Sequence, residues 1–324
     1  MKRLGTVIAA LALVVQSHGP AGAQDYPTKP ITIVLVLAPG TGLDTVARAY
    51  GEKLAQSLGK PVVFDNRPGA NGIVAVAALK NMPADGHALL VGTSGPLGAN
   101  KITYKHLPYD PAKDLVPVSL YLKSPFVLIV NPSLPVKSVP ELIKFMKGRP
   151  GELAYSSTGH GGAPRLATEL FLQSFGLKAT HVPYKNSPQS IADVAAGHVQ
   201  LAFSEAGATQ VLIQEGRLRV LAVSSLARLN HLPDVPTMAE AGYAGLELAP
   251  WLGFFAPAGT SASAVRRLAN AVADASGYGA VQQELFKLGF DPVAMTPVGF
   301  ANAVKADLER WAPLVKASGF STEG

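Results

Sequence analysis

Short apolar runs along this chain alternate with segments in which apolar residues recur at helical spacing. Residues 31–37 form a continuous run rich in β-branched side chains, which is typical of a buried strand in a parallel sheet. After a Pro/Gly turn, apolar residues recur every three or four positions up to Leu58, and Gly59 provides a helix stop. Further segments are predicted as a strand at 61–64, a helix at 74–79 and a strand at 88–91. This order predicts a parallel α/β layer.

The same order of elements recurs in the second part of the chain. Strands are predicted at 126–130, 153–156, 180–184, 199–203 and 218–223, and helices at 139–147, 166–175 and 190–196. A strand at 252–256 and two amphipathic helices follow, one at 263–275 and one carrying Phe300, Val304, Leu308 and Trp311. Because this tail contains no third sheet, we expect it to return to the first unit.

The fold class predicted is therefore α/β, with two lobes that face one another across a cleft. The first lobe is assigned to 24–124 plus 248–324 and the second to 125–247, with hinge crossings near 122–125 and 246–250. A chain of 324 residues is long enough to bury a large core in two such units.

The N-terminus predicts export. Lys2 and Arg3 precede an apolar run at 4–15, and the small-x-small sequence at 21–23 fits a signal-peptidase site, so residues 1–23 are predicted to be a signal peptide cleaved before Gln24. The apolar run is shorter than the roughly 20 residues that span a bilayer. A single N-terminal membrane anchor is the alternative.

Composition excludes several classes of function. The chain contains no cysteine, which excludes a disulfide framework, a lipobox, a thiol nucleophile and thiolate-bound metal. The formal net charge of +6 falls to +4 without Lys2 and Arg3, and the basic residues are scattered, so no nucleic-acid partner is expected. The seven histidines lack metal-ligand spacing, so neither a metal site nor a cofactor is predicted.

The turn after the first strand is one candidate for ligand binding. It contains Pro39, Gly40, Thr41, Gly42 and Asp44. Its glycines let the backbone approach a ligand, and free amides at the start of the next helix attract anions. The alternative is an ordinary βα turn in which Asp44 or Thr45 caps the helix. The missing third glycine and missing lysine exclude a dinucleotide fingerprint and a P-loop.

A turn at the equivalent place in the second lobe is the other candidate. It contains Ser156, Ser157, Gly159, His160, Gly161, Gly162 and Arg165. Arg165 could pair bidentately with a carboxylate. A cation at a helix N-terminus opposes the helix dipole, so its position favours a ligand role over the alternative of a surface arginine.

Catalytic interpretations have less support. Ser156, His160 and Asp193 could be joined into a triad, but no G-x-S-x-G elbow surrounds Ser156 or Ser157. Glu205 is the carboxylate next to a strand end of the second lobe, and a ligand-bonding or solvated role is favoured over a general base. The sequence therefore predicts a binding cleft with no catalytic residue. A hydrolase using Ser156 or Ser157 with His160 is the alternative.

A series of short motifs is similar to those of a known family. The motifs are Tyr26-Pro27-x-Lys29-Pro30-Ile31, the 39–44 turn, 66–70 (NRPGA), 107–111 (LPYDP), 130–134 (VNPSL), 181–185 (HVPYK), 232–237 (LPDVPT) and 256–260 (APAGT). Over essentially its whole mature length, the chain resembles the periplasmic receptors of tripartite tricarboxylate transporters, the TctC-like or Bug proteins.

The resemblance implies a type II periplasmic-binding-protein fold that closes around its ligand at a hinge. It implies a small organic carboxylate held by backbone amides and bridging waters between residues 39–44 and 156–162, with Ser94 also in contact. Tyr184 and Ser204 complete the candidate binding set. Integral-membrane transporter subunits are the implied partners of a periplasmic monomer, and a sensor kinase is the alternative partner.

Three departures from the family pattern bear on the ligand. The first turn has Ala38 and Thr41, where the family is richer in Pro and Gly. Arg165 stands where the family commonly has His, and Ser204-Glu205 stands where it has Asp-Asn. The gain of Arg165 predicts a ligand with a second anionic group. An amino acid, whose ammonium group would face Glu205, is the alternative.

Overall fold

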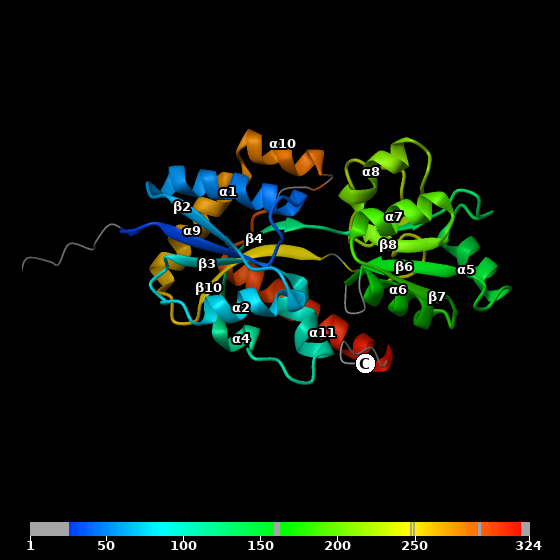
Figure 1. The fold of residues 1–324 in the computed structure, drawn as a ribbon, viewed down its shortest axis with the longest axis horizontal. Helices are drawn as coiled ribbons and strands as arrows, with labels where there is room; N and C mark the ends of the chain where they lie inside the picture. Colours follow the sequence, from blue (N-terminus) through cyan, green and yellow to red (C-terminus); the bar gives the residue numbers. More distant parts are fainter. Residues whose placement is uncertain are drawn as a thin grey trace, which may run out of the picture.

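The computed structural model describes residues 26–158, 163–246, 248, 250–288, 290 and 293–318, so the predicted signal peptide lies outside the described residues. Two lobes lie side by side, each built on a five-stranded sheet with helices on both faces (Figure 1). We call the lobe that contains the first strand lobe 1 and the other lobe 2.

The sheet of lobe 1 has the strand order β2-β1-β3-β10-β4. Its strands are β1 (Ile31–Leu35), β2 (Val62–Asn66), β3 (Ala88–Thr93), β4 (Leu115–Lys123) and β10 (Trp251–Pro257). One face packs against α1 (Gly42–Leu58), α9 (Ala262–Ser276) and α10 (Gly279–Lys287). The other face packs against α2 (Ile73–Lys80), the short α4 (Pro111–Asp114) and the first part of α11 (Pro297–Ser318).

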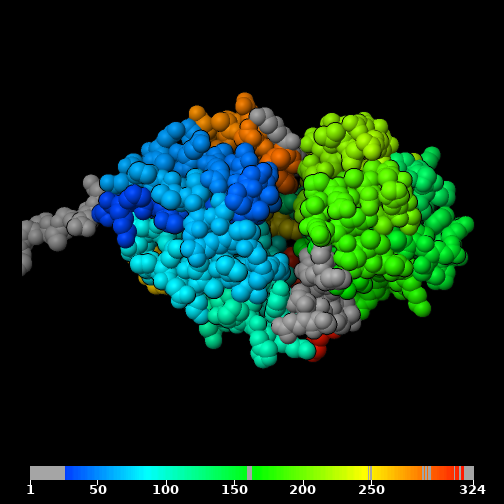
Figure 2. All heavy atoms as spheres, viewed as in Figure 1, coloured from blue at the N-terminus to red at the C-terminus, as the bar shows by residue number. Residues whose placement is uncertain are grey.

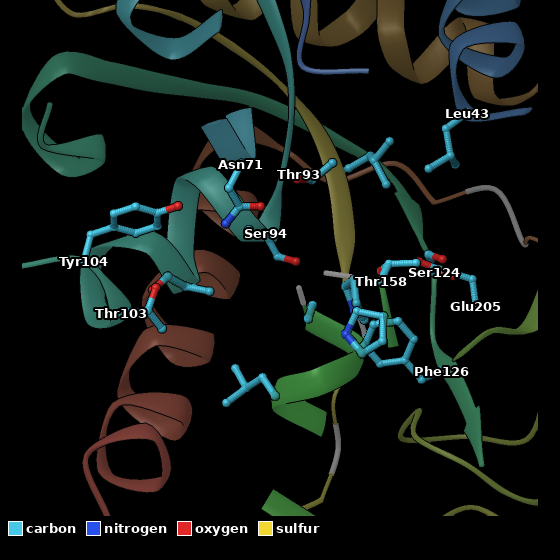
Figure 3. Close-up of a pocket in the computed structure, with 17 residues that line it drawn as sticks. Leu43, Asn71, Thr93, Ser94, Thr103, Tyr104, Ser124, Phe126, Thr158 and Glu205 are labelled. Carbon is cyan, nitrogen blue, oxygen red and sulfur yellow. The ribbon is translucent and has the colours of Figure 1, made fainter. Parts of the chain in front are cut away.

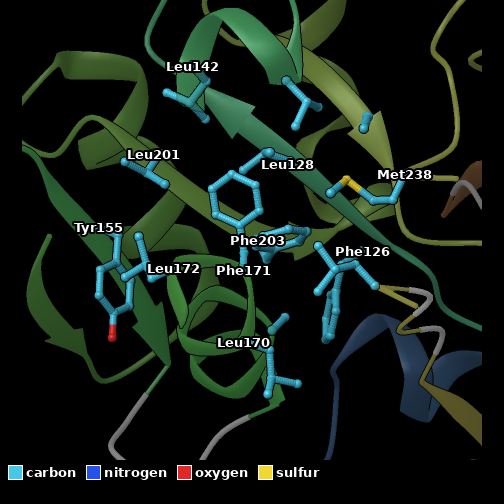
Figure 4. Close-up of a cluster of buried hydrophobic side chains, with 14 of the residues drawn as sticks. Phe126, Leu128, Leu142, Tyr155, Leu170, Phe171, Leu172, Leu201, Phe203 and Met238 are labelled. Atoms are coloured by element: carbon cyan, nitrogen blue, oxygen red, sulfur yellow. The ribbon is translucent and has the colours of Figure 1, made fainter. Parts of the chain in front are cut away.

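The sheet of lobe 2 repeats this plan with the order β7-β6-β8-β5-β9. Its strands are β5 (Phe126–Val130), β6 (Ala154–Thr158), β7 (Thr180–Tyr184), β8 (Leu201–Glu205) and β9 (Arg219–Val223). The helices α5 (Val139–Lys147) and α6 (Ala163–Ser174) cover one face, where aromatic and aliphatic side chains form the core in Figure 4. The helices α7 (Ser187–Ala196) and α8 (Ala206–Gln214) cover the other.

Both sheets are mixed, whereas the sequence predicts parallel layers. β10 is antiparallel to β3 and β4, and β5 is antiparallel to β8 and β9. Each of these strands is the one by which the chain enters its sheet from the other lobe, so it runs against its neighbours. The nine-residue β4 is absent from the predicted strands because Pro117 interrupts its apolar run, and a proline is tolerated there because β4 is an edge strand.

The chain crosses between the sheets at 123–126 and again just before β10, where Leu248 and Pro250 are described, close to the predicted hinge segments. The amide of Ser124 donates to the carbonyl of Pro250 at 2.6 Å. The buried Ser224 hydroxyl accepts from the amide of Phe126 at 2.8 Å and donates to the carbonyl of Leu248. The two crossings are thus bonded to each other. The exact lobe boundaries stay a prediction.

The C-terminal helix α11 contacts both lobes. Phe300, near its start, is buried in the core of lobe 1. Trp311 and Val315, further along, belong to the buried cluster of lobe 2 with Phe126 and Leu166. The tail was expected to pack against lobe 1 alone, but the 22-residue length of α11 carries it past the cleft to α6.

We expect Trp311→Ala to lower the free energy of unfolding by about 3–5 kcal/mol, because it removes a large side chain from a packed core. Trp311 is 3% exposed. Urea denaturation measures the change, and Val298→Ala on the exposed side of α11 is the control, with an expected effect below about 0.5 kcal/mol. Equal stabilities of the two variants would contradict the packing described for α11.

Candidate functional site

A cavity of about 460 Å³ opens between the two lobes, where Figure 2 shows the surface hollowed. The ends of β3, β6 and β8 and both crossing segments border it, so both lobes line one space. Its polar lining residues are Asn71, Thr93, Ser94, Thr103, Tyr104, Ser124, Thr158 and Glu205, and its larger apolar ones are Leu43, Phe126, Pro164, Leu166, Pro250 and Leu252. This volume and mixed lining suit a small organic molecule.

The lobe 1 wall is built around Ser94, directly after β3. Ser94 is buried and its hydroxyl points toward the space between the walls (Figure 3). No described residue hydrogen-bonds this hydroxyl, which leaves it available to a ligand. Ser94 directly follows β3, whose side chains are mostly buried in the core, so the end of this strand places the Ser94 hydroxyl at the cavity.

Asn71 forms another part of this wall and is held rigidly. Its backbone is left-handed, with φ of 49°, a conformation that asparagine tolerates better than most residues. Its side-chain amide donates to Oδ1 of Asn100 at 2.5 Å, and the Asn100 amide donates back to the carbonyl of Asn71 at 3.1 Å. Gly72 follows with φ of 83°, and a Cβ there would come within 2.7 Å of Pro96. This close packing fixes the wall of the cavity.

The hinge side of the cavity carries Ser124 and Glu205. Ser124 is 2% exposed, and its hydroxyl has no hydrogen-bond partner within the part of the chain that the structure describes. Glu205 ends β8 and accepts from the Ser187 hydroxyl at 3.4 Å. Burial raises the pKa of Glu205, and hydrogen bonds to its carboxylate, including that from Ser187, oppose the rise only in part.

The charge of this lining is unbalanced. Among the lining residues that the structure describes, Glu205 is the only one with an ionisable carboxyl, ammonium, guanidinium or imidazole group. The other polar groups are neutral hydroxyls and amides. Such groups bind by donating and accepting hydrogen bonds, so the described lining suits the binding of a polar molecule.

The predicted first turn does not line the cavity. Pro39, Gly40 and Thr41 are exposed, and neither Gly42 nor Asp44 reaches the cavity, although Leu43 between them does. The Thr41 hydroxyl accepts from the amide of Asp44 at 3.3 Å and caps α1. These contacts match the alternative of a capped βα turn, with Thr41 rather than Asp44 or Thr45 as the cap.

The carboxylate of Asp44 holds this turn together. It accepts from the amide of Gly40 at 2.9 Å, Nε of Arg48 at 2.9 Å and Nδ2 of Asn66 at 2.8 Å. Burial alone would raise the pKa of Asp44, but the bonds from Arg48, Asn66 and Gly40 outweigh it and hold that pKa below its ordinary value. The donors that these bonds provide to the Asp44 carboxylate therefore all belong to lobe 1.

The second predicted turn is described only in part, because Gly159, His160, Gly161 and Gly162 lie outside the described residues. Ser156 and Ser157 are buried and do not line the cavity. The Ser190 hydroxyl donates to Ser156 at 2.8 Å, and Oγ of Ser157 lies 2.7 Å from Nε2 of His181. The hydrolase alternative pairs a serine with His160, which lies outside the described residues, and His181 is a described partner of Ser157.

Arg165 likewise faces its own lobe. Its Nε lies 3.7 Å from Oε1 of Glu169, one helical turn along α6, and Glu169 also accepts from the Tyr155 hydroxyl. This acidic partner is a structural reason for a cation at the start of a helix. Arg165 is not among the residues that line the cavity.

Two further predicted residues also have local roles. The Tyr184 hydroxyl donates to Asp193 at 2.6 Å, and Nδ1 of His198 lies 3.5 Å from Asp193, so the described contacts of Asp193 are within lobe 2. Ser204 is buried on the face of β8 opposite to Phe203 and Glu205, because side chains alternate along a strand.

Of the predicted set, Ser94 and Glu205 reach the cavity wall. The ligand roles of all these residues stay predictions. Sequence reasoning did not select Asn71, Thr93 or Ser124, and Thr158 lies within the implied segment 156–162 without being singled out. The Asn71-Gly72 dipeptide is a turn signal after a strand, and Thr93 and Thr158 end their strands, so strand ends were the signal to follow. No turn signal or motif in the neighbouring sequence indicates that Ser124 lines the site.

Known proteins are similar to this chain over nearly all of its length. A model of the family described as tripartite tricarboxylate transporter family receptor matches residues 46–320. Protein BugT of Bordetella pertussis is 35% identical over 320 residues, covering 98% of each chain.

Two solved structures of relatives carry organic acids. Rpa4515 of R. palustris with adipate is 35% identical, with a TM-score of 0.79 over 91% of this chain and 99% of that one. MatC of Rhodopseudomonas palustris with bound malate is 29% identical, with a TM-score of 0.75 over 90% of this chain and 100% of that one. With two mixed sheets in two lobes, the predicted two-lobed α/β fold of periplasmic binding proteins is confirmed. In the described part of the chain, no helix has the length and apolar character to cross a membrane.

We expect Asp44→Asn to lower the free energy of unfolding by about 1–3 kcal/mol near neutral pH, because it weakens three bonds to a buried carboxylate. Because the folded-state pKa lies below the unfolded value of roughly 3.9, the charged group stabilises the fold above that pH. This contribution is lost as the pH falls through the folded-state pKa, so the difference between the wild type and the variant shrinks there.

Urea denaturation at several pH values measures the effect of Asp44→Asn. Asp274→Asn, at an exposed position on α9, is the matched control and should change stability little at any pH. A deficit in Asp44→Asn that does not change with pH would contradict the role given to the carboxylate.

Proposed function

The chain belongs to the tripartite tricarboxylate transporter family of receptors, and on that basis we propose that it is a periplasmic solute-binding protein. It captures a small organic carboxylate between its lobes and presents it, as a monomer, to integral-membrane transporter subunits. It catalyses no reaction. The leader-like sequence at 1–23 supports export, and the ligands of Rpa4515 and MatC, adipate and malate, support a carboxylate as the ligand class.

The observation that carries this proposal is the cavity of about 460 Å³ whose two walls belong to different lobes. Ser94 offers an unoccupied hydroxyl donor from lobe 1 and Thr158 lines the opposing wall. When a carboxylate binds between these two residues, protein donors take the place of the water molecules around its oxygens. Each hydrogen bond to a charged group contributes about 1.5–3 kcal/mol. Binding of both walls at once favours a closed arrangement of the lobes.

Closure requires movement at the two crossings, 123–126 and just before β10, since these are the segments by which the chain passes from one sheet to the other. A few residues at element ends commonly absorb such a rotation. The ligand would stabilise the closed form because it contacts both walls only there. The transporter subunits would then distinguish loaded from empty receptor by the relative position of the lobes.

We expect a thermal-shift panel of dicarboxylates such as adipate, malate and succinate, aromatic acids and amino acids to raise the melting temperature with at least one member. A ligand at 100 times its dissociation constant adds about 2.7 kcal/mol to the free energy of unfolding. A panel of carboxylates without any shift would refute the proposal.

Ser94→Ala should raise the dissociation constant of that ligand about tenfold, because the variant loses one charge-assisted hydrogen bond. Isothermal titration calorimetry measures the change. Ser133→Ala, at an exposed position of lobe 2, is the control and should bind as the wild type does. If Ser94→Ala bound the ligand with wild-type affinity, the role of Ser94 as a ligand contact would be contradicted.

A further inference from the structure

The hinge side of the cavity places a carboxyl group where a receptor for anions has no obvious use for one. Glu205 and the buried hydroxyl of Ser124 lie together on the side of the cavity opposite to Ser94 and Asn71 (Figure 3). A negative charge beside a bound carboxylate opposes binding. The negative charge of Glu205 therefore calls for a cationic group near its carboxylate.

The described part of the protein does not provide a cationic partner. Glu205 forms no ion pair with a described Lys, Arg or His, and its carboxylate accepts from neutral donors, its own backbone amide and the Ser187 hydroxyl at 3.4 Å. Ser124 is 2% exposed, and its hydroxyl has no partner among the described residues. Neither of these adjacent polar groups has a matching partner among the described residues, which indicates that the occupant of the cavity supplies one.

We infer that the ligand carries a protonated amine as well as its carboxylate, with the ammonium group at Glu205 and Ser124 and the carboxylate at Ser94. This inference rests on the proposed function and narrows its ligand class to amino carboxylates. An ammonium group has three donors, which match the carboxylate of Glu205 and the free acceptor of Ser124.

The surroundings of Glu205 strengthen the pairing. Phe126 lies opposite Glu205 in the ladder between β5 and β8 and also lines the cavity, so an aromatic ring is available beside the cation. Arg165, which the sequence offered for a second anionic group of the ligand, lies with Glu169 outside the cavity lining. The second polar end of the ligand therefore meets an acid rather than a base.

Calorimetry with pairs of ligands that differ only in the α-ammonium group tests the inference. The pairs are L-glutamate and glutarate, L-aspartate and succinate, and L-phenylalanine and 3-phenylpropanoate. We expect at least one amino member to bind the wild type at least about tenfold more tightly than its partner. Glu205→Gln keeps the size of the side chain and removes its charge, so it should reduce this preference to about threefold or less.

Glu215→Gln is the matched control, since it makes the same change at the far, exposed end of α8 and should keep the preference. Equal or tighter binding of the amine-free acids by the wild type would overturn the inference without any variant. A preference that survives in Glu205→Gln would also overturn it. In both cases carboxylate binding itself would stand, whereas a folded wild type that binds no member of any pair would refute the proposed function together with the inference.

Discussion

The arrangement of the two lobes depends on the hydrogen bonds that join the two crossing segments. The hydroxyl of Ser224, which is fully buried, accepts from the amide of Phe126 and donates to the carbonyl of Leu248, and the amide of Ser224 donates to the carbonyl of Phe126 at 2.8 Å. Ser124 adds a bond to Pro250. Because these bonds tie both crossings to the end of β9, they fix the two crossings relative to each other.

The same constraint explains the site. The crossing strands β5 and β10 must run against their neighbours, which leaves the remaining inner strands parallel, with their carboxyl ends toward the cleft. Strand ends are where a side chain can leave the core without breaking the sheet, and Ser94, Thr158 and Glu205 all occupy such positions. The helix α11 also joins the lobes, because Phe300 is buried in the core of lobe 1 and Trp311 in that of lobe 2.

Most strands and longer helices were predictable because apolar periodicity reflects burial against a sheet. The edge strand β4 was not, since Pro117 interrupts its apolar run, and α8 and α10 were not predicted either. Within the site, Ser94 and Glu205 were accessible to sequence reasoning because each follows an apolar strand. Ser204 and Glu205 are neighbours whose side chains lie on opposite faces of β8. The role of Asp44 depends on Asn66, which lies 22 residues further along the chain, at the end of β2. The partner of Arg165, Glu169, lies at helical spacing and could have been found.

The central claim is that a carboxylate binds between the lobes, against Ser94. The crystal structure of the protein with the carboxylate that stabilises it most tests this directly. The account predicts the ligand in contact with both lobes, with a carboxylate oxygen at hydrogen-bond distance from the Ser94 hydroxyl. A ligand bound outside this cavity, or touching one lobe alone, would contradict it.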